Sequence, residues 1–223
     1  MSRAFQFCDV QFEVAGEAAL FWPEKRALLV SDLHLEKASS YAERSGQMLP
    51  PYDSMATLQA IAALVESHSA TTIYCLGDNF HDDGGEARLA APAAQLLQSI
   101  TASLGWHWIT GNHDREISGR WGGTAHDALS VGGLMLRHEA ESDCQTPEIS
   151  GHFHPKYRLH HRGRNLSRRC FVVSARKIVM PALGALTGGL DAAHQAIRTA
   201  CGDNDLTALV PTNGHLARFS LAA

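Results

Sequence analysis

The sequence contains no long apolar run, and this absence excludes one class of protein. None of its stretches reaches the roughly 18 consecutive apolar residues that a membrane-spanning helix needs. Its first residues, Met1–Phe5, also lack the apolar segment of a secretory signal peptide. We therefore expect a cytoplasmic protein that has no membrane partner.

Cysteine is scarce, and its spacing suggests no pairing. The five cysteines, at positions 8, 75, 144, 170 and 201, are odd in number and form no Cys-x-x-Cys motif. This pattern favours reduced thiols, as in a cytosol, over a disulfide framework. The chain also lacks internal repeats, low-complexity linkers and the Gly-x-x-x-x-Gly-Lys loop that binds nucleotide phosphates. Its 223 residues are enough for one substantial core, and we expect a single domain over residues 1–223.

Acidic residues are missing from the segment 149–190, although the whole chain carries a net charge of −4. The segment holds eight basic residues: Lys156, Arg158, Arg162, Arg164, Arg168, Arg169, Arg176 and Lys177. Such an asymmetry can create a phosphate-attracting face on a protein that is acidic overall. The alternative is that these charges are ordinary solvated side chains of strands and loops.

Five short polar clusters each follow an apolar run that is typical of a strand. The runs are Ala27–Val30, Ile73–Leu76, Trp106–Ile109, Leu134–Leu136 and Glu148–Ser150. The clusters that follow are Asp32-Leu33-His34, Gly77-Asp78, Gly111-Asn112-His113-Asp114, His138 and Gly151-His152-Phe153-His154. If these strands lie side by side in a sheet, their carboxyl ends converge in one crevice, where open α/β sheets usually bind ligands.

The remaining pattern predicts an α/β protein. Apolar residues recur at helical spacing after Asp53, and a second helix is expected over residues 86–104 despite Pro92. Two helices that each join two strands imply parallel pairing through crossovers. We expect a loop over residues 38–51, and a mostly antiparallel second half with one helix near residues 191–200.

The side chains of the clusters suit a site for two metal ions. Asp32 and His34 alternate with one intervening residue, so both can contact one cation. Asp78 follows a glycine at a strand end, and its two oxygens can bridge two cations. Asn112 offers a neutral oxygen, while His138, His152 and His154 offer imidazole nitrogens. A single histidine is more often a surface or packing residue, and we assign that role to His68, His107, His126, His160, His161, His194 and His215.

The ordered set of clusters resembles the calcineurin-like metallophosphoesterase superfamily over about Val30 to Pro155. Within it, the strings 31–37, 77–82 and 180–189 resemble the bacterial DNA ligase-associated metallophosphoesterases. This resemblance implies a four-layer α/β/β/α sandwich of two mixed sheets flanked by helices. It also implies DNA as substrate, and DNA ligase and helicase repair proteins as partners.

The resemblance also implies residue roles. One ion would be held by Asp32, His34, Asp78 and His154, and the other by Asp78, Asn112, His138 and His152. His113 would be the catalytic histidine, oriented by Asp114 or by His81. Two cations about 3.5–4 Å apart activate a water toward phosphorus. The mixed oxygen and nitrogen ligands favour Mn²⁺, with Fe or Zn²⁺ as alternatives.

Three departures from the superfamily pattern bear on the substrate. Phosphatases of the superfamily place an aspartate where this chain has His81, and the Gly-Asp-x-Phe-His string is similar to the nuclease branch. His138 is followed by Glu139-Ala140 rather than the frequent Gly-Asp or Gly-His. The short stretch between His138 and His152 leaves no room for the helical lid of related lipid-A precursor hydrolases.

Three hypotheses about function follow. The first is a nuclease or phosphodiesterase that acts on DNA in repair, supported by His81 and the basic segment. The second is a phosphodiesterase or phosphatase for small nucleotide-type phosphate esters. The third, from another class, is an inactive, metal-stabilised scaffold that binds DNA or a partner protein.

Overall fold

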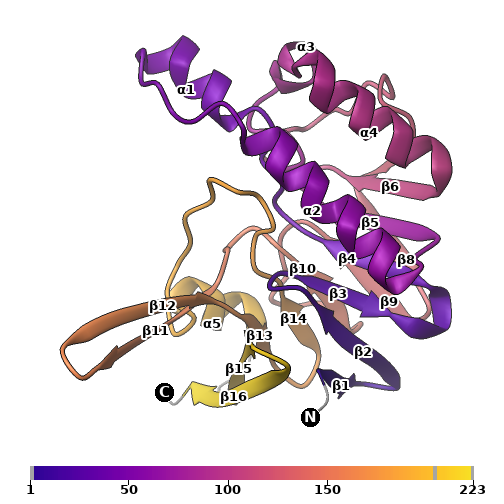
Figure 1. The fold of residues 1–223 in the computed structure, drawn as a ribbon. Helices are drawn as coiled ribbons and strands as arrows, with labels where there is room; N and C mark the ends of the chain where they lie inside the picture. The colour runs from indigo at the N-terminus through magenta and orange to yellow at the C-terminus, as the bar shows by residue number, and fades with distance from the viewer. Residues whose placement is uncertain (1–2, 203–204, 222–223) are drawn as a thin grey trace.

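The computed structural model describes residues 3–202 and 205–221, and a seven-stranded sheet forms its amino-terminal half (Figure 1). The first four strands pair antiparallel, and the last four, from β4 on, pair parallel. The parallel pairing through two crossovers is therefore confirmed. The strands lie in chain order: β1 (Ala4–Phe7), β2 (Val10–Ala15), β3 (Ala19–Trp22), β4 (Ala27–Val30), β5 (Thr72–Leu76), β6 (Gly105–Ile109) and β7 (Thr124–His126).

A second seven-stranded sheet forms the carboxyl-terminal half. Its pairing is antiparallel, as expected, except that β10 runs parallel to both of its neighbours, β9 and β14. The order across the sheet is β16 (His215–Leu221), β15 (Leu206–Thr212), β13 (Phe171–Val173), β14 (Lys177–Val179), β10 (Glu148–Ser150), β9 (Leu134–Arg137) and β8 (Ala128–Val131). A separate two-stranded ribbon consists of β11 (Lys156–His161) and β12 (Arg164–Arg169).

Helices cover the outer face of each sheet. The elements are η1 (Pro23–Lys25), α1 (Lys37–Ser45), α2 (Asp53–His68), α3 (Gly85–Arg88), α4 (Ala91–Ser103) and α5 (Gln195–Cys201). Both α2 and α4 lie on the first sheet, and α5 packs on the second (Figure 1). Among the described residues, no helix has the length and apolarity required to cross a bilayer.

Three apolar cores separate the resulting four layers. One lies between α2, α4 and the first sheet, one between the two sheets, and one between the second sheet and α5. Successive side chains of a strand point to opposite faces of the sheet, so one strand contributes to two cores. In β4, Leu28 and Val30 face the helices, whereas Ala27 and Leu29 face the second sheet. The α/β/β/α sandwich is confirmed, and its mixed sheets hold strands that are buried on both faces.

The expectation of a loop over residues 38–51 was wrong in part, because Lys37–Ser45 form α1. The first turn of this helix is held by side chains from the start of α2. Asp53 Oδ2 accepts a hydrogen bond from Ala38 N at 3.0 Å, and Ser54 Oγ accepts one from Glu36 N at 2.8 Å. A helix end satisfied by partners from a distant turn leaves little signal in its own sequence.

The single helix expected over residues 86–104 is two helices. α3 ends at Arg88, and α4 begins at Ala91 with Pro92 in its first turn. Proline has no N–H to donate and its ring clashes with the preceding turn, so it is tolerated at a helix start but not in the interior. Pro92 therefore marks the beginning of a helix.

Replacing Leu29 by Ala should remove part of the core between the two sheets. Leu29 is fully buried, and large-to-small changes at such positions lower the free energy of unfolding by about 2–5 kcal/mol. Denaturant unfolding measures the change. Leu159→Ala, on the exposed ribbon, is the control and should have a much smaller effect. Equal effects of the two substitutions would contradict the placement of this core.

Candidate metal centre

The five polar clusters meet at one edge of the sandwich. Those after β4, β5 and β6 come from the first sheet, as the sequence predicted for neighbouring strands. Those after β9 and β10 come from the second sheet, so the five strands do not share one sheet. The carboxyl ends of both sets nevertheless converge, and their polar side chains lie within a few ångströms of one another.

The first group of donor atoms comes from Asp32, His34 and His154. Their ligand atoms lie within 4.8 Å of one another. His154 Nε2 is 3.2 Å from Asp32 Oδ1 and 3.3 Å from His34 Nε2. One carboxylate and two imidazoles thus face a single small volume.

The second group comes from Asp78, Asn112, His138 and His152. Asn112 Oδ1 is 3.0 Å from both His138 Nε2 and His152 Nδ1, and these two nitrogens are 3.1 Å apart. His138 Nε2 is also 3.4 Å from Asp78 Oδ1. Carboxylate, amide and imidazole donors again point to one position.

Asp78 joins the two groups. Its Oδ1 faces His138, and its Oδ2 is 3.7 Å from His34 Nε2 in the first group. The side chain is almost fully buried between the sheets. This arrangement places every residue that the sequence assigned as a metal ligand around two adjacent volumes. The chemistry of the donors fits divalent cations that accept both oxygen and nitrogen.

The backbone of the site is strained. Among the described residues, ten non-glycine positions have positive φ angles, and five of them are candidate ligands: Asp32, His34, Asp78, His152 and His154. Left-handed backbone is uncommon for residues with a Cβ and typically persists only where the surroundings impose it. Concentrated at one edge of the fold, this strain marks a functional site.

Neighbouring groups orient the ligands. His138 Nδ1 is 3.1 Å from the Leu76 carbonyl oxygen, so the proton resides on Nδ1 and Nε2 keeps its lone pair for a cation. Asp32 accepts hydrogen bonds from the His152 backbone N–H and from the Ser31 hydroxyl. The sequence interpretation missed Ser31, because a serine beside a motif carries no signal of its own.

The charge states suit cation binding. Burial lowers the pKa of His34 to about 2, so this imidazole is neutral at physiological pH. Burial alone would raise the pKa of Asp32, but hydrogen bonds and charges from His154, His138 and Ser31 lower it below its ordinary value. A neutral imidazole beside an ionised carboxylate is the ligand form that a metal requires.

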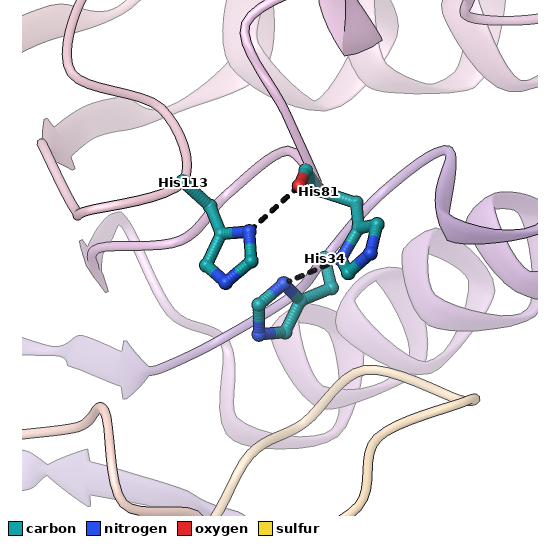
Figure 2. A group of neighbouring side chains, drawn as sticks. All are labelled: His34, His81 and His113. Carbon is teal, nitrogen blue, oxygen red and sulfur yellow. Dashed lines mark hydrogen bonds between the residues drawn. The ribbon is translucent and has the colours of Figure 1, made fainter. Parts of the chain in front are cut away.

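His81 and His113 stand beside the first group of donors (Figure 2). His113 Nδ1 donates a hydrogen bond to the main-chain carbonyl oxygen of His81 at 2.8 Å, which leaves Nε2 4.0 Å from Asp78 Oδ2. The His81 ring lies 3.2 Å from His34 through their Nδ1 atoms. Burial, followed by the charges of Lys37 and His113, lowers the pKa of His81 to about 4. A neutral His81 can therefore accept a hydrogen bond from the His34 Nδ1–H, which directs His34 Nε2 toward the centre.

Asp114 has a different environment from the one considered in the sequence. Its Oδ2 accepts hydrogen bonds from the backbone and side-chain nitrogens of Asn79, both at 2.8 Å, and from Phe80 N at 3.1 Å. Its Oδ1 accepts one from Gly111 N at 3.1 Å. The carboxylate therefore ties the loop after β5 to the loop after β6. Of the two groups considered for orienting His113, the contact is made by His81.

Comparison with known proteins relates this geometry to a family. A model described as calcineurin-like phosphoesterase matches residues 25–168. The structure of the nuclease MPE of Pseudomonas putida is similar, with 27% sequence identity, a TM-score of 0.71, and coverage of 86% of this chain and 91% of that chain. A search of curated proteins found no match.

Two further structures are only weakly similar. A predicted phosphoesterase from Streptococcus pneumoniae has 12% identity and a TM-score of 0.36, covering 93% of this chain and 99% of that chain. Vps29 from Entamoeba histolytica, complexed with zinc, has 13% identity and a TM-score of 0.36, covering 87% and 98%. Similarities this weak support no conclusion about the present chain.

Replacing Gly77 by Ala should disturb the second group of donors. A Cβ at Gly77 would overlap the His138 ring, and the residue also has a φ of +79°. We expect loss of one bound cation, measured by elemental analysis or metal titration. Gly119→Ala is a matched control, because Gly119 has a φ of +77° but no atom near its added Cβ. Alanine is unfavourable at a positive φ, so both variants should have a lower free energy of unfolding than wild type. Equal metal loss in both would contradict the steric explanation.

Proposed function

Because the chain belongs to the calcineurin-like phosphoesterase family, we propose that it hydrolyses phosphodiester bonds and that its substrate is DNA. The observation that carries this proposal is the buried Asp78 carboxylate, shared by two groups of donors, with His113 Nε2 beside it. Such a centre suits a phosphoester hydrolase. The finer assignment to DNA is supported by His81 in place of the phosphatase aspartate and by the similarity to a nuclease.

The residues divide the chemical work. When bound, the two cations would supply Lewis-acid activation of water and neutralise charge on the phosphate oxygens. His113 holds its Nδ1 proton on the His81 carbonyl, so Nε2 is the nitrogen that gains or loses a proton. In its protonated form, His113 Nε2 can stabilise the transition state or protonate the leaving oxygen.

Mn²⁺ is the cation we propose for both positions. Each position combines carboxylate or amide oxygens with imidazole nitrogens, and no cysteine belongs to either group. Mg²⁺ prefers oxygen ligands alone, whereas Mn²⁺ accepts both types. Fe and Zn²⁺ are the alternatives that elemental analysis distinguishes. A role in DNA repair with ligase and helicase partners is part of this proposal and is supported by the sequence resemblance.

A specific cavity favours a second candidate, a phosphodiesterase or phosphatase for small nucleotide-type esters. A cavity of about 520 Å³ lies on the loops that follow His81 and His113, and is lined by Asp83, Glu86, Arg115, Glu116, Ile117 and Ser118. Its volume is sufficient for a small ligand. The three acidic side chains in its lining disfavour phosphate groups, so we rank this candidate below DNA.

Substitution of Asp78 and of His113 should have different consequences. Asp78→Asn removes the charge shared by both groups of donors, so we expect loss of bound metal and of activity together. His113→Gln leaves the donors intact, so metal should stay bound while turnover slows by about 10²–10⁴-fold. Elemental analysis and hydrolysis of bis-p-nitrophenyl phosphate measure the two effects. Wild-type activity in either variant would contradict the assigned roles.

A panel of four substrates tests the proposed specificity. We expect Mn²⁺-loaded protein to hydrolyse bis-p-nitrophenyl phosphate and labelled single- or double-stranded DNA in preference to p-nitrophenyl phosphate. Cleavage of the monoester alone would overturn the nuclease assignment and favour a phosphatase. Binding of DNA with no hydrolysis of any substrate would instead favour the metal-stabilised scaffold.

A further inference from the structure

The ribbon β11–β12 stands apart from both sheets and projects beyond them (Figure 1). Its register places Lys156 opposite Arg169, Arg158 opposite Ser167, and Leu159 opposite Leu166. Because side chains alternate along each strand, the ribbon has two distinct faces. Lys156, Arg158 and Arg169 share one face, which we call the basic face.

The other face anchors the ribbon to the body of the protein. Tyr157 stacks on Phe219 of β16, with ring centroids 4.3 Å apart and ring planes 13° apart. Tyr157 also packs against the core between the second sheet and α5. Arg168 is opposite Tyr157 in the register and lies on this same face. The basic face is therefore turned away from the core.

Each cation of the basic face donates a hydrogen bond to a main-chain carbonyl oxygen of the loop after β14. Lys156 Nζ donates to Thr187 O at 3.3 Å, Arg158 to Gly189 O at 3.2 Å, and Arg169 to Gly184 O at 2.8 Å. In the part of the chain that the structure describes, none of the three is ion-paired with a carboxylate. Glu17 lines the same cavity as Arg169 and partly compensates its charge, whereas Lys156 and Arg158 form no ion pair with a carboxylate among the described residues.

The same loop reaches the metal centre. Gly184 N donates to the Asp32 carbonyl oxygen at 3.2 Å, and Leu183 N donates to Ser31 O at 2.8 Å. At its other end, Gly189 packs so closely on the His154 backbone that a Cβ there would overlap the His154 carbonyl oxygen. The loop therefore contacts two candidate metal ligands, Asp32 and His154, and it also contacts the basic face. A negatively charged chain that leaves the metal centre on this side meets three cations.

We propose that the basic face of the ribbon binds the phosphate backbone of the DNA strand whose phosphodiester lies at the metal centre. This inference rests on the proposed function and adds a binding surface for the polymer. Lys156 and Arg158 are two residues apart on β11, or about 7 Å at 3.3 Å per residue. That spacing matches about two nucleotide steps at the 3.4 Å rise of a duplex strand.

Binding measurements on Arg158 variants test the proposal. Arg158 is exposed, so its substitution should leave the fold intact. We expect Arg158→Ala to weaken binding of a labelled 20-nucleotide DNA strand, measured by fluorescence anisotropy without added metal. The slope of log affinity against log salt should fall in magnitude by about 0.7–0.9, the value for one lost phosphate contact. Arg158→Lys, which keeps the charge, should retain the wild-type slope.

The matched control is Arg168→Ala, which removes the same charge from an exposed position on the opposite face of the ribbon. It should leave the affinity and the salt slope close to wild type. Unchanged affinity in Arg158→Ala, or equal weakening in Arg168→Ala, would overturn the assignment of the basic face.

Hydrolysis of bis-p-nitrophenyl phosphate separates this inference from the proposed function. The small diester does not reach the ribbon, so wild type and Arg158→Ala should hydrolyse it equally. If the Mn²⁺-loaded wild type fails to hydrolyse it, the proposed function is wrong. If the wild type hydrolyses it and both Arg158→Ala and Arg168→Ala bind DNA like wild type, only the present inference is wrong.

Discussion

The Asp78 carboxylate is the constraint on which the rest of the site depends. One buried side chain must face His34 from the first sheet and His138 from the second, so the carboxyl ends of both sheets must meet. Burying the carboxylates of Asp32 and Asp78 is costly unless cations compensate their charge. Binding of divalent ions would offset both the free-energy cost of burying these charges and the backbone strain at the ligands. The stability of this edge of the fold is therefore expected to be coupled to metal binding.

The positions of the candidate ligands follow from local sequence, whereas the architecture around them does not. Continuous apolar runs identify β4, β5 and β6, and a polar residue directly after such a run is placed at a strand end. That rule holds equally for β9 and β10, yet nothing local reveals that these two strands belong to another sheet. The helix α1 was missed for a similar reason, since Asp53 and Ser54 satisfy its first turn from outside.

The roles of His81 and Asp114 show where motif reasoning ends. The motif identifies both residues as neighbours of His113, but the choice between them depends on the direction of one carbonyl group. The main chain of His81 accepts the His113 proton, while its ring contacts His34. Asp114 instead receives N–H groups from Asn79 and Phe80 and holds two loops in register. Hydrogen bonds to backbone atoms are independent of residue identity and leave no pattern in the sequence.

The proposed selection of a long substrate depends on the connections that precede and follow β10. The segment between β9 and β10 is short and contains no helix or strand. The connection from β10 to β13 instead carries the projecting ribbon β11–β12 directly after His154. A centre without a helical lid leaves room for a chain that continues past it, and the basic face that we propose to bind DNA would attract that chain electrostatically. The proposed function and the proposed binding surface thus lie on adjacent segments, joined by the loop that contacts Asp32, His154 and the basic face.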